Sequence, residues 1–125
     1  MAELTRPEID PPTGEAPTEL QITDEVVGDG AEATRGATVS THYLGVAFST
    51  GEEFDASWNR GAPLDFRLGV GQVIAGWDQG IAGMKVGGRR RLVIPPHLAY
   101  GQRGAGRAIG PNETLIFVVD LVQIG

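Results

Sequence analysis

The sequence predicts an α+β domain, in which an antiparallel sheet of about five strands carries one short helix across one face. Most of the chain consists of short apolar runs separated by glycine-rich turns, a pattern typical of antiparallel strands. Only one segment has the spacing of an amphipathic helix, and a lone helix among strands can bury its apolar side only against the sheet. A length of 125 residues with 41% apolar content suits one such domain.

The beginning of the chain has a different composition. Residues 1–19 contain four prolines among acids and threonines, and they show no apolar periodicity. Five of the acids and only one arginine lie there, so the rest of the chain is nearly neutral. We therefore expect a disordered, acidic, proline-rich leader over residues 1–19 and one folded domain over residues 20–125.

Turns bound the predicted strands. The run that starts at Leu20 ends at Gly28-Asp29-Gly30, and the next run ends at the turn-like residues 49–52. The last run is rich in branched and aromatic residues, as a buried strand should be. The predicted strands are residues 20–27, 38–48, 64–68, 89–94 and 114–124.

The helix is predicted over residues 73–84, where Val73, Trp77 and Ile81 recur at i, i+4 and i+8. This segment is short and interrupted by glycines. A long glycine-rich, charged loop follows between Pro95 and Pro111, and loops of this length often carry function.

Composition excludes several classes of function. The chain has no cysteine, which excludes disulfides and thiolate chemistry and suits a reducing compartment. Its two histidines are far apart and lack a metal-ligand spacing, so we expect no metal site. No signal peptide or membrane-spanning stretch is evident, and we expect a cytoplasmic protein. The Arg89-Arg90-Arg91 run is interpreted as a solvated, partly packed strand edge and not as a nucleic-acid or membrane-binding surface.

The usual catalytic motifs are missing. There is no Gly-x-Ser-x-Gly elbow and no Walker loop, and residues 69–76 begin like a dinucleotide fingerprint but have a misplaced third glycine. What remains is a set of aromatic and aliphatic residues beside the loops. In a domain of this size, most of them would ordinarily belong to the core, so composition alone leaves both readings open.

The order of short motifs along the chain resembles that of FKBP-type peptidyl-prolyl cis-trans isomerases. The resemblance covers residues 20–124 and implies a twisted antiparallel sheet of five or six strands curled around one short helix. The motifs that carry it are THYLG at 41–45, FDAS at 54–57, FRLG at 66–69, VIAGW at 73–77, GMKVG at 83–87, LAYG at 98–101 and TLIF at 114–117.

The resemblance also implies an activity, which is rotation about X-Pro peptide bonds without any cofactor, in a monomeric protein that assists folding. X-Pro segments of folding proteins and macrolides of the tacrolimus and rapamycin type are the implied partners. The implied catalytic residues are Asp55, Tyr100, Phe117 and Trp77, and the implied substrate-binding residues are Tyr43, Phe54, Arg60, Leu64, Phe66, Gln72, Val73, Ile74, Ala99 and Ile109.

Within this implied site, Trp77 forms the floor of the proline pocket. The Ile74 N–H and the Tyr100 hydroxyl donate to substrate carbonyls, and Asp55 lies at the rim, paired with Arg60 and close to the Tyr43 hydroxyl. Taken without the resemblance, Asp55 would be an ordinary turn acid after a strand.

Some positions depart from the animal cytosolic form of the family and make the loop side of the pocket smaller and less apolar. This affects ligand affinity and substrate preference more than activity. An alternative that remains open is a non-catalytic adaptor that binds proline peptides or macrolides. The departing residues are Leu64, Gln72, Ala105, Ala108 and Gly110.

Overall fold

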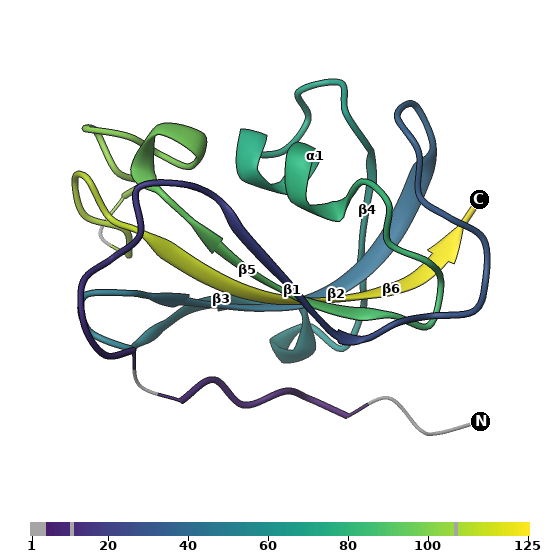
Figure 1. Ribbon diagram of the computed structural model, residues 1–125, viewed down its shortest axis with the longest axis horizontal. Coiled ribbons are helices and arrows are strands. Elements are labelled where there is room, and N and C mark those ends of the chain that lie inside the picture. The colour runs from purple at the N-terminus through teal and green to yellow at the C-terminus, as the bar shows by residue number, and fades with distance from the viewer. Residues whose placement is uncertain (1–4, 11, 107) are drawn as a thin grey trace.

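The structure, a computed structural model, describes residues 5–10, 12–106 and 108–125. A curved sheet holds the helix against its inner face, which confirms the predicted α+β class (Figure 1). In chain order the strands and the helix are β1 Gln21–Val26, β2 Thr38–Ala47, β3 Glu53–Ala56, β4 Leu64–Arg67, α1 Ala75–Ile81, β5 Arg89–Ile94 and β6 Leu115–Ile124. Two 3-10 turns, η1 Ser57–Asn59 and η2 Pro96–Leu98, complete the described elements.

The six strands form one antiparallel sheet in the order β1-β5-β6-β2-β3, and β4 also pairs with β2. Strand β2 is long enough to hold both short partners on one side, because β4 pairs with residues 38–41 and β3 with residues 44–46. The turn η1 lies between these two short strands. We did not predict β3, since its sequence Glu-Phe-Asp-Ala is short and carries two acids.

Helix α1 is shorter than predicted and covers residues 75–81 instead of 73–84. Ile74 and Ala82 have extended backbones, with ψ angles of 150° and 132°, and they bound it. The glycines within the helix have a packing role. A Cβ atom on Gly76 would lie 2.4 Å from Cγ2 of Ile94, and such a close approach of helix and strand requires glycine.

The side chains of the central strands alternate between two clusters. The larger cluster lies between the sheet and α1 and includes Tyr43, Trp77 and Phe117. A smaller cluster on the outer face consists of Val46, Val93 and Ile116, with Ile9 and Phe48 packed against it. The period of two along a strand explains why neighbouring residues, such as Ile116 and Phe117, belong to different clusters.

The N-terminal segment runs beneath the outer face of the sheet, on the side away from α1 (Figure 1). Within it, Pro7 is buried and Ile9 packs against the outer cluster, while the disorder expected for residues 1–19 stays a prediction. Composition did not indicate this packing, since only one large apolar residue is involved. The boundary between leader and domain at residue 20 stays a prediction.

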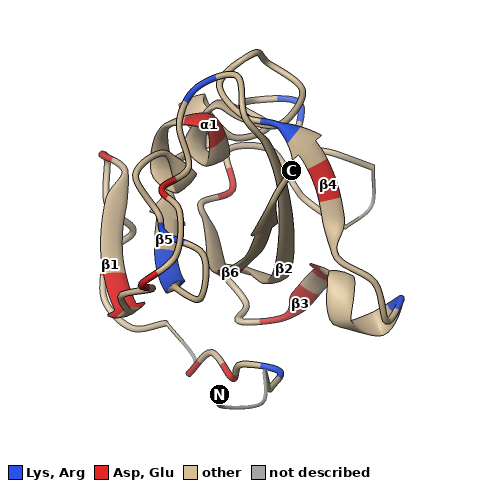
Figure 2. Cartoon of the chain, turned by 90° about the vertical axis from the view of Figure 1, so that its right-hand side faces the viewer, with Lys and Arg blue, Asp and Glu red and all other residues tan. Residues whose placement is uncertain are grey.

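Two of the three arginines of β5 are paired with acids, and Figure 2 shows β5 in blue beside acidic residues of β1. Arg89 lies 2.7 Å from Asp120, and Arg90 lies 2.7 Å from Asp24 while donating to the Gly80 carbonyl at 2.8 Å. The Arg90 side chain is only 11% exposed, so it is less solvated than we expected. No helix in the described part of the chain is long and apolar enough to cross a membrane.

Candidate functional site

A cavity of about 230 Å³ opens on the inner side of the sheet, beside the start of α1. The strands β2, β3, β4 and β6, the helix and the loop after η2 all contribute side chains to it. The lining residues are Tyr43, Phe54, Asp55, Leu64, Gln72, Val73, Ile74, Trp77, Tyr100 and Phe117. All ten are among the residues predicted from the sequence.

Aromatic rings that meet edge to face build the floor of this cavity. The Trp77 ring is 4% exposed, and its centroid lies 4.9 Å from Tyr43 and 5.2 Å from Phe117. Phe54 adds a further edge contact to Phe117, at 5.4 Å between centroids. Such arrangements are preferred by aromatic pairs, so the floor is a rigid apolar surface.

The rim of the cavity carries a hydrogen-bonded network of three polar side chains. The Tyr43 hydroxyl donates to Asp55 Oδ2 at 2.6 Å, and Arg60 Nη2 donates to the Tyr43 hydroxyl at 3.0 Å. Arg60 Nη1 also lies 3.3 Å from Asp55 Oδ1, which confirms the expected pairing. Burial and the Asp55 carboxylate raise the pKa of Tyr43, so this phenol remains protonated at neutral pH.

Ser57 fixes the turn that follows Asp55, and the sequence did not indicate this role. Its buried hydroxyl accepts a hydrogen bond from the Tyr43 N–H at 2.7 Å and lies 2.9 Å from His42 Nδ1. His42 itself stacks on Trp58, with ring centroids 4.4 Å apart. Alternation along β2 therefore places Tyr43 inside the cavity and His42 outside it.

Two N–H groups in or beside the cavity make no hydrogen bond to another described residue. One is the backbone N–H of Ile74, immediately before α1, and the other is the buried indole Nε1 of Trp77. Buried donors without a partner are rare, and the only other one among the described side chains is the indole Nε1 of Trp58, outside the cavity. Tyr100, which is 41% exposed, closes the open side of the cavity, and burial and the Asp55 charge raise its pKa.

Comparison with known proteins identifies this architecture. Residues 30–122 match the family model described as FKBP-type peptidyl-prolyl cis-trans isomerase. The chain belongs to this family. An FK506-binding protein from Streptomyces anulatus is 67% identical over 122 residues, which cover 97% of this chain and 98% of that protein. A probable FK506-binding protein from Corynebacterium glutamicum is 52% identical, with 96% and 99% covered.

Solved structures agree with the family assignment. The crystal structure of AtFKBP13 matches with a TM-score of 0.80 and 45% identity, over 88% of this chain and 96% of that chain. The crystal structure of FkpA from Escherichia coli matches with a TM-score of 0.77 and 43% identity, over 84% of this chain and 47% of that chain.

In this FKBP-type chain, hydrogen bonds from backbone N–H groups to two side chains order the loop that leads into the helix. The Asp78 carboxylate accepts hydrogen bonds from the N–H groups of Gly69 and Gly71, at 2.8 and 3.0 Å. Gln72 Oε1 accepts another from the Arg67 N–H at 2.8 Å. The loop therefore holds Val73 and Ile74 at the cavity. The role of Asp78 was not predicted, although an acid in the first turn of a helix is favoured by the helix dipole.

Four predicted site residues lie behind or beside the lining of the FKBP-type cavity. Phe66 is buried against Trp77, with centroids 5.6 Å apart, and Ala99 and Ile109 pack in the inner cluster. Arg60 reaches the rim through Asp55 and Tyr43. Their roles in binding stay predictions. Among the departing positions, Ala108 and Gly110 line a separate hollow next to Phe54.

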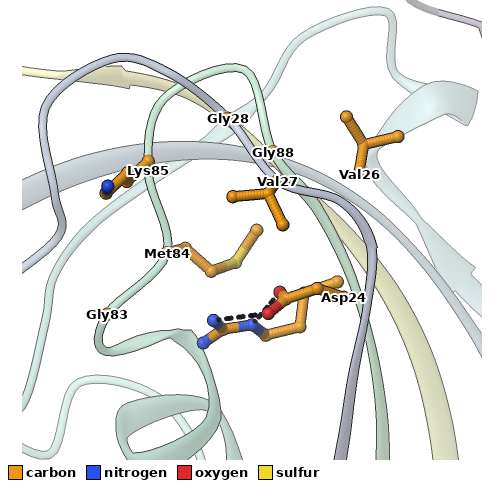
Figure 3. Close-up of a pocket in the computed structure, with 9 residues that line it drawn as sticks. Asp24, Val26, Val27, Gly28, Gly83, Met84, Lys85 and Gly88 are labelled. Atoms are coloured by element: carbon orange, nitrogen blue, oxygen red, sulfur yellow. Dashed lines mark hydrogen bonds and ion pairs between the residues drawn. The ribbon is translucent and has the colours of Figure 1, made fainter.

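A second, smaller cavity of about 70 Å³ lies where β1 ends beside the loop after α1 (Figure 3). Two of its three charged residues are already paired, because Arg90 binds Asp24 and also donates to the carbonyls of Gly80 in α1 and of Ala82 just after it. Lys85 is the third charged residue of this lining. Among the described residues, no three His, Cys, Asp or Glu side chains come together as a metal site would require.

Proposed function

We propose that this chain is an active peptidyl-prolyl cis-trans isomerase, which binds X-Pro segments in the aromatic cavity and accelerates rotation about the bond before proline. The observation that carries the proposal is the Trp77 floor with the unpaired Ile74 N–H beside it. A prolyl ring fits an apolar floor, and an adjacent N–H can hold a substrate carbonyl. Tyr100 also lines the cavity, and its hydroxyl can hold another.

Such a cavity can catalyse rotation without forming a bond to substrate. Rotation about an amide loses resonance and has a barrier of about 18–20 kcal/mol. The twisted amide is less polar than the planar one, so a water-poor aromatic cavity stabilises it relative to the ground state. A millionfold acceleration requires about 8 kcal/mol, which desolvation, orientation and a few hydrogen bonds can supply.

We further propose that tacrolimus and rapamycin bind in the same cavity, in keeping with the names of the relatives from Streptomyces and Corynebacterium. The smaller loop side, with Ala108 and Gly110 outside the lining, favours a lower affinity. Since the chain has no cysteine, we place it in a reducing compartment, the cytoplasm, where it assists folding as a monomer.

The decisive experiment measures isomerisation and binding together. A protease-free exchange assay on a short X-Pro peptide should show turnover that tacrolimus abolishes. In a Trp58→Phe variant, which removes the indole stacked on His42 outside the cavity, Trp77 emission should change saturably with tacrolimus. Binding without turnover would indicate the adaptor function instead. The absence of both binding and turnover would refute the proposal.

The turnover should be almost independent of pH near neutrality. None of the described residues that line the cavity is a histidine, and burial raises the pKa values of Tyr43 and Tyr100 above their ordinary value near 10. Both phenols therefore remain hydrogen-bond donors, and we expect less than about a threefold change in kcat/KM between roughly pH 6 and 9. A change of about tenfold in kcat/KM, with its midpoint near pH 6.5, would mean that a histidine takes part.

A further inference from the structure

Residues 5–10 lie against the outer face of the sheet, opposite the aromatic cavity (Figure 1). Pro7 is buried, although prolines of a solvated leader would be exposed. Ile9 packs with Phe48 against the outer cluster of Val46, Val93 and Ile116. The segment thus covers apolar surface that the sheet would otherwise present to water.

A backbone contact fixes the start of the segment. The Thr5 carbonyl accepts a hydrogen bond from Arg89 Nη2. Arg89 is itself held by Asp120, which is 2% exposed and accepts from Arg89 Nε at 2.7 Å. The guanidinium is therefore positioned by a buried carboxylate, and one of its remaining N–H groups is directed at the segment.

Arg6 joins the segment to two elements of the domain. Its Nη1 donates to Asn59 Oδ1 at 2.8 Å, and its Nη2 pairs with Glu53. Asn59 Nδ2 also donates to Glu53 Oε2 at 2.9 Å, so the three side chains form a closed network. Glu53 belongs to β3 and Asn59 to η1.

These two partners of Arg6 bracket the rim of the cavity. Glu53 precedes Phe54 and Asp55 in the chain, and Asn59 precedes Arg60. The network on the outer face and the network of Tyr43, Asp55 and Arg60 on the inner face therefore share the same short stretch of backbone. A change in the outer network can therefore reach the rim network through only one or two peptide units.

We propose that the outer face of the sheet is a binding site for an extended Arg-Pro-x-Ile segment, that residues 6–9 of this chain occupy it, and that the occupied site holds the cavity rim in place through Arg6. Exposed ion pairs contribute little by themselves, so Pro7 and Ile9 supply the affinity, and Arg6 sets the direction and register of the segment.

The segment lies outside the part of the chain that the family model matches. The family model begins at residue 30, beyond this segment. The relatives from Streptomyces and Corynebacterium nevertheless align with 122 and 120 of the 125 residues, so their matches extend into the leader.

Backbone order parameters of the full-length protein test the occupied site. The amides of residues 6, 8, 9 and 10 should have values of about 0.85, like those of a folded strand. Replacing Ile9 by serine should lower them and raise the unfolding equilibrium constant about tenfold, because an apolar contact is lost. The matched variant Glu8→Ser, at an exposed neighbour, should do neither. Values below about 0.6 in the unmodified protein would overturn the proposal.

The variant Arg6→Gln tests the link between the N-terminal segment and the cavity rim. Its tacrolimus-affinity measurement rests on the proposed function, whereas its mobility measurement does not. This variant should increase the mobility of the amides of residues 53–60 and weaken tacrolimus binding about threefold, whereas Glu8→Gln should change neither. Arg6→Lys, which keeps the charge but lacks the planar fork, should restore only part of the effect. Unchanged mobility in Arg6→Gln would refute the link. If the unmodified protein does not bind tacrolimus, the macrolide-binding proposal fails. The order parameters would still decide whether residues 6–9 occupy the outer face and whether Arg6 holds the cavity rim.

Discussion

Gly76→Val is expected to lower the free energy of unfolding by about 3 kcal/mol or more, the upper part of the range for overpacked cores. A Cβ atom at this position would lie within 3 Å of three atoms of Ile94, a fully buried side chain of β5. The helix would have to move away from the sheet. Trp77 is the next residue, so the cavity floor would move with it.

Urea denaturation measures this effect, and Ala75→Val is its matched control. Ala75 is the neighbouring residue of α1 and is exposed, so the same side chain meets no buried atoms there. Valine has a higher helix propensity than glycine, hence a loss of stability at position 76 must come from packing. An equal loss in both variants would contradict the close contact between α1 and β5.

Phe117→Leu is expected to lower kcat/KM by about tenfold, which corresponds to about 1.4 kcal/mol of transition-state stabilisation. Phe117 makes edge contacts with Tyr43, Phe54 and Trp77, so a leucine would leave the floor incomplete. Leucine remains apolar and close in volume, and the protein should stay folded. The protease-free exchange assay on a short X-Pro peptide would measure the change in kcat/KM.

Val118→Ala provides the control on the same strand. Val118 is 1% exposed and follows Phe117, so its side chain lies on the other face of β6, away from the cavity. We expect it to cost about 2 kcal/mol of stability and to leave kcat/KM nearly unchanged. Full turnover in Phe117→Leu combined with inactivity of a folded Val118→Ala would mean that the cavity involves the opposite face of the strand.

Periodicity predicted the long elements well, because burial on one or both faces dictates their side chains. Strand β6 and the helix containing Trp77 and Ile81 were evident for this reason. Periodicity did not predict β3, because its four residues alternate between polar and apolar but are too few to stand out as a strand, and it overextended α1. The helix ends where the backbone of Ile74 and Ala82 becomes extended, a tertiary constraint that single residues do not encode.

Motif order predicted the residues that line the site, whereas only the structure reveals the residues that hold them in place. A resemblance assigns residues such as Trp77 and Tyr100, since these belong to contiguous motifs. Ser57, Asp78 and Arg6 act through hydrogen bonds between segments distant in the chain or across a turn. Polar residues of this kind are common in turns and leaders, and the sequence alone does not indicate their partners.

The position of β6 in the sheet has a consequence for synthesis on the ribosome. Residues 115–124 pair with β5 on one side and with β2 on the other, so they form the middle of the sheet. Until these residues leave the exit tunnel, β2 and β5 have no common neighbour, and the apolar side chains of both remain open to water. The domain therefore cannot complete its fold in stages from its N-terminus. We expect it to fold after release of β6, in one slow step dominated by contacts between distant residues.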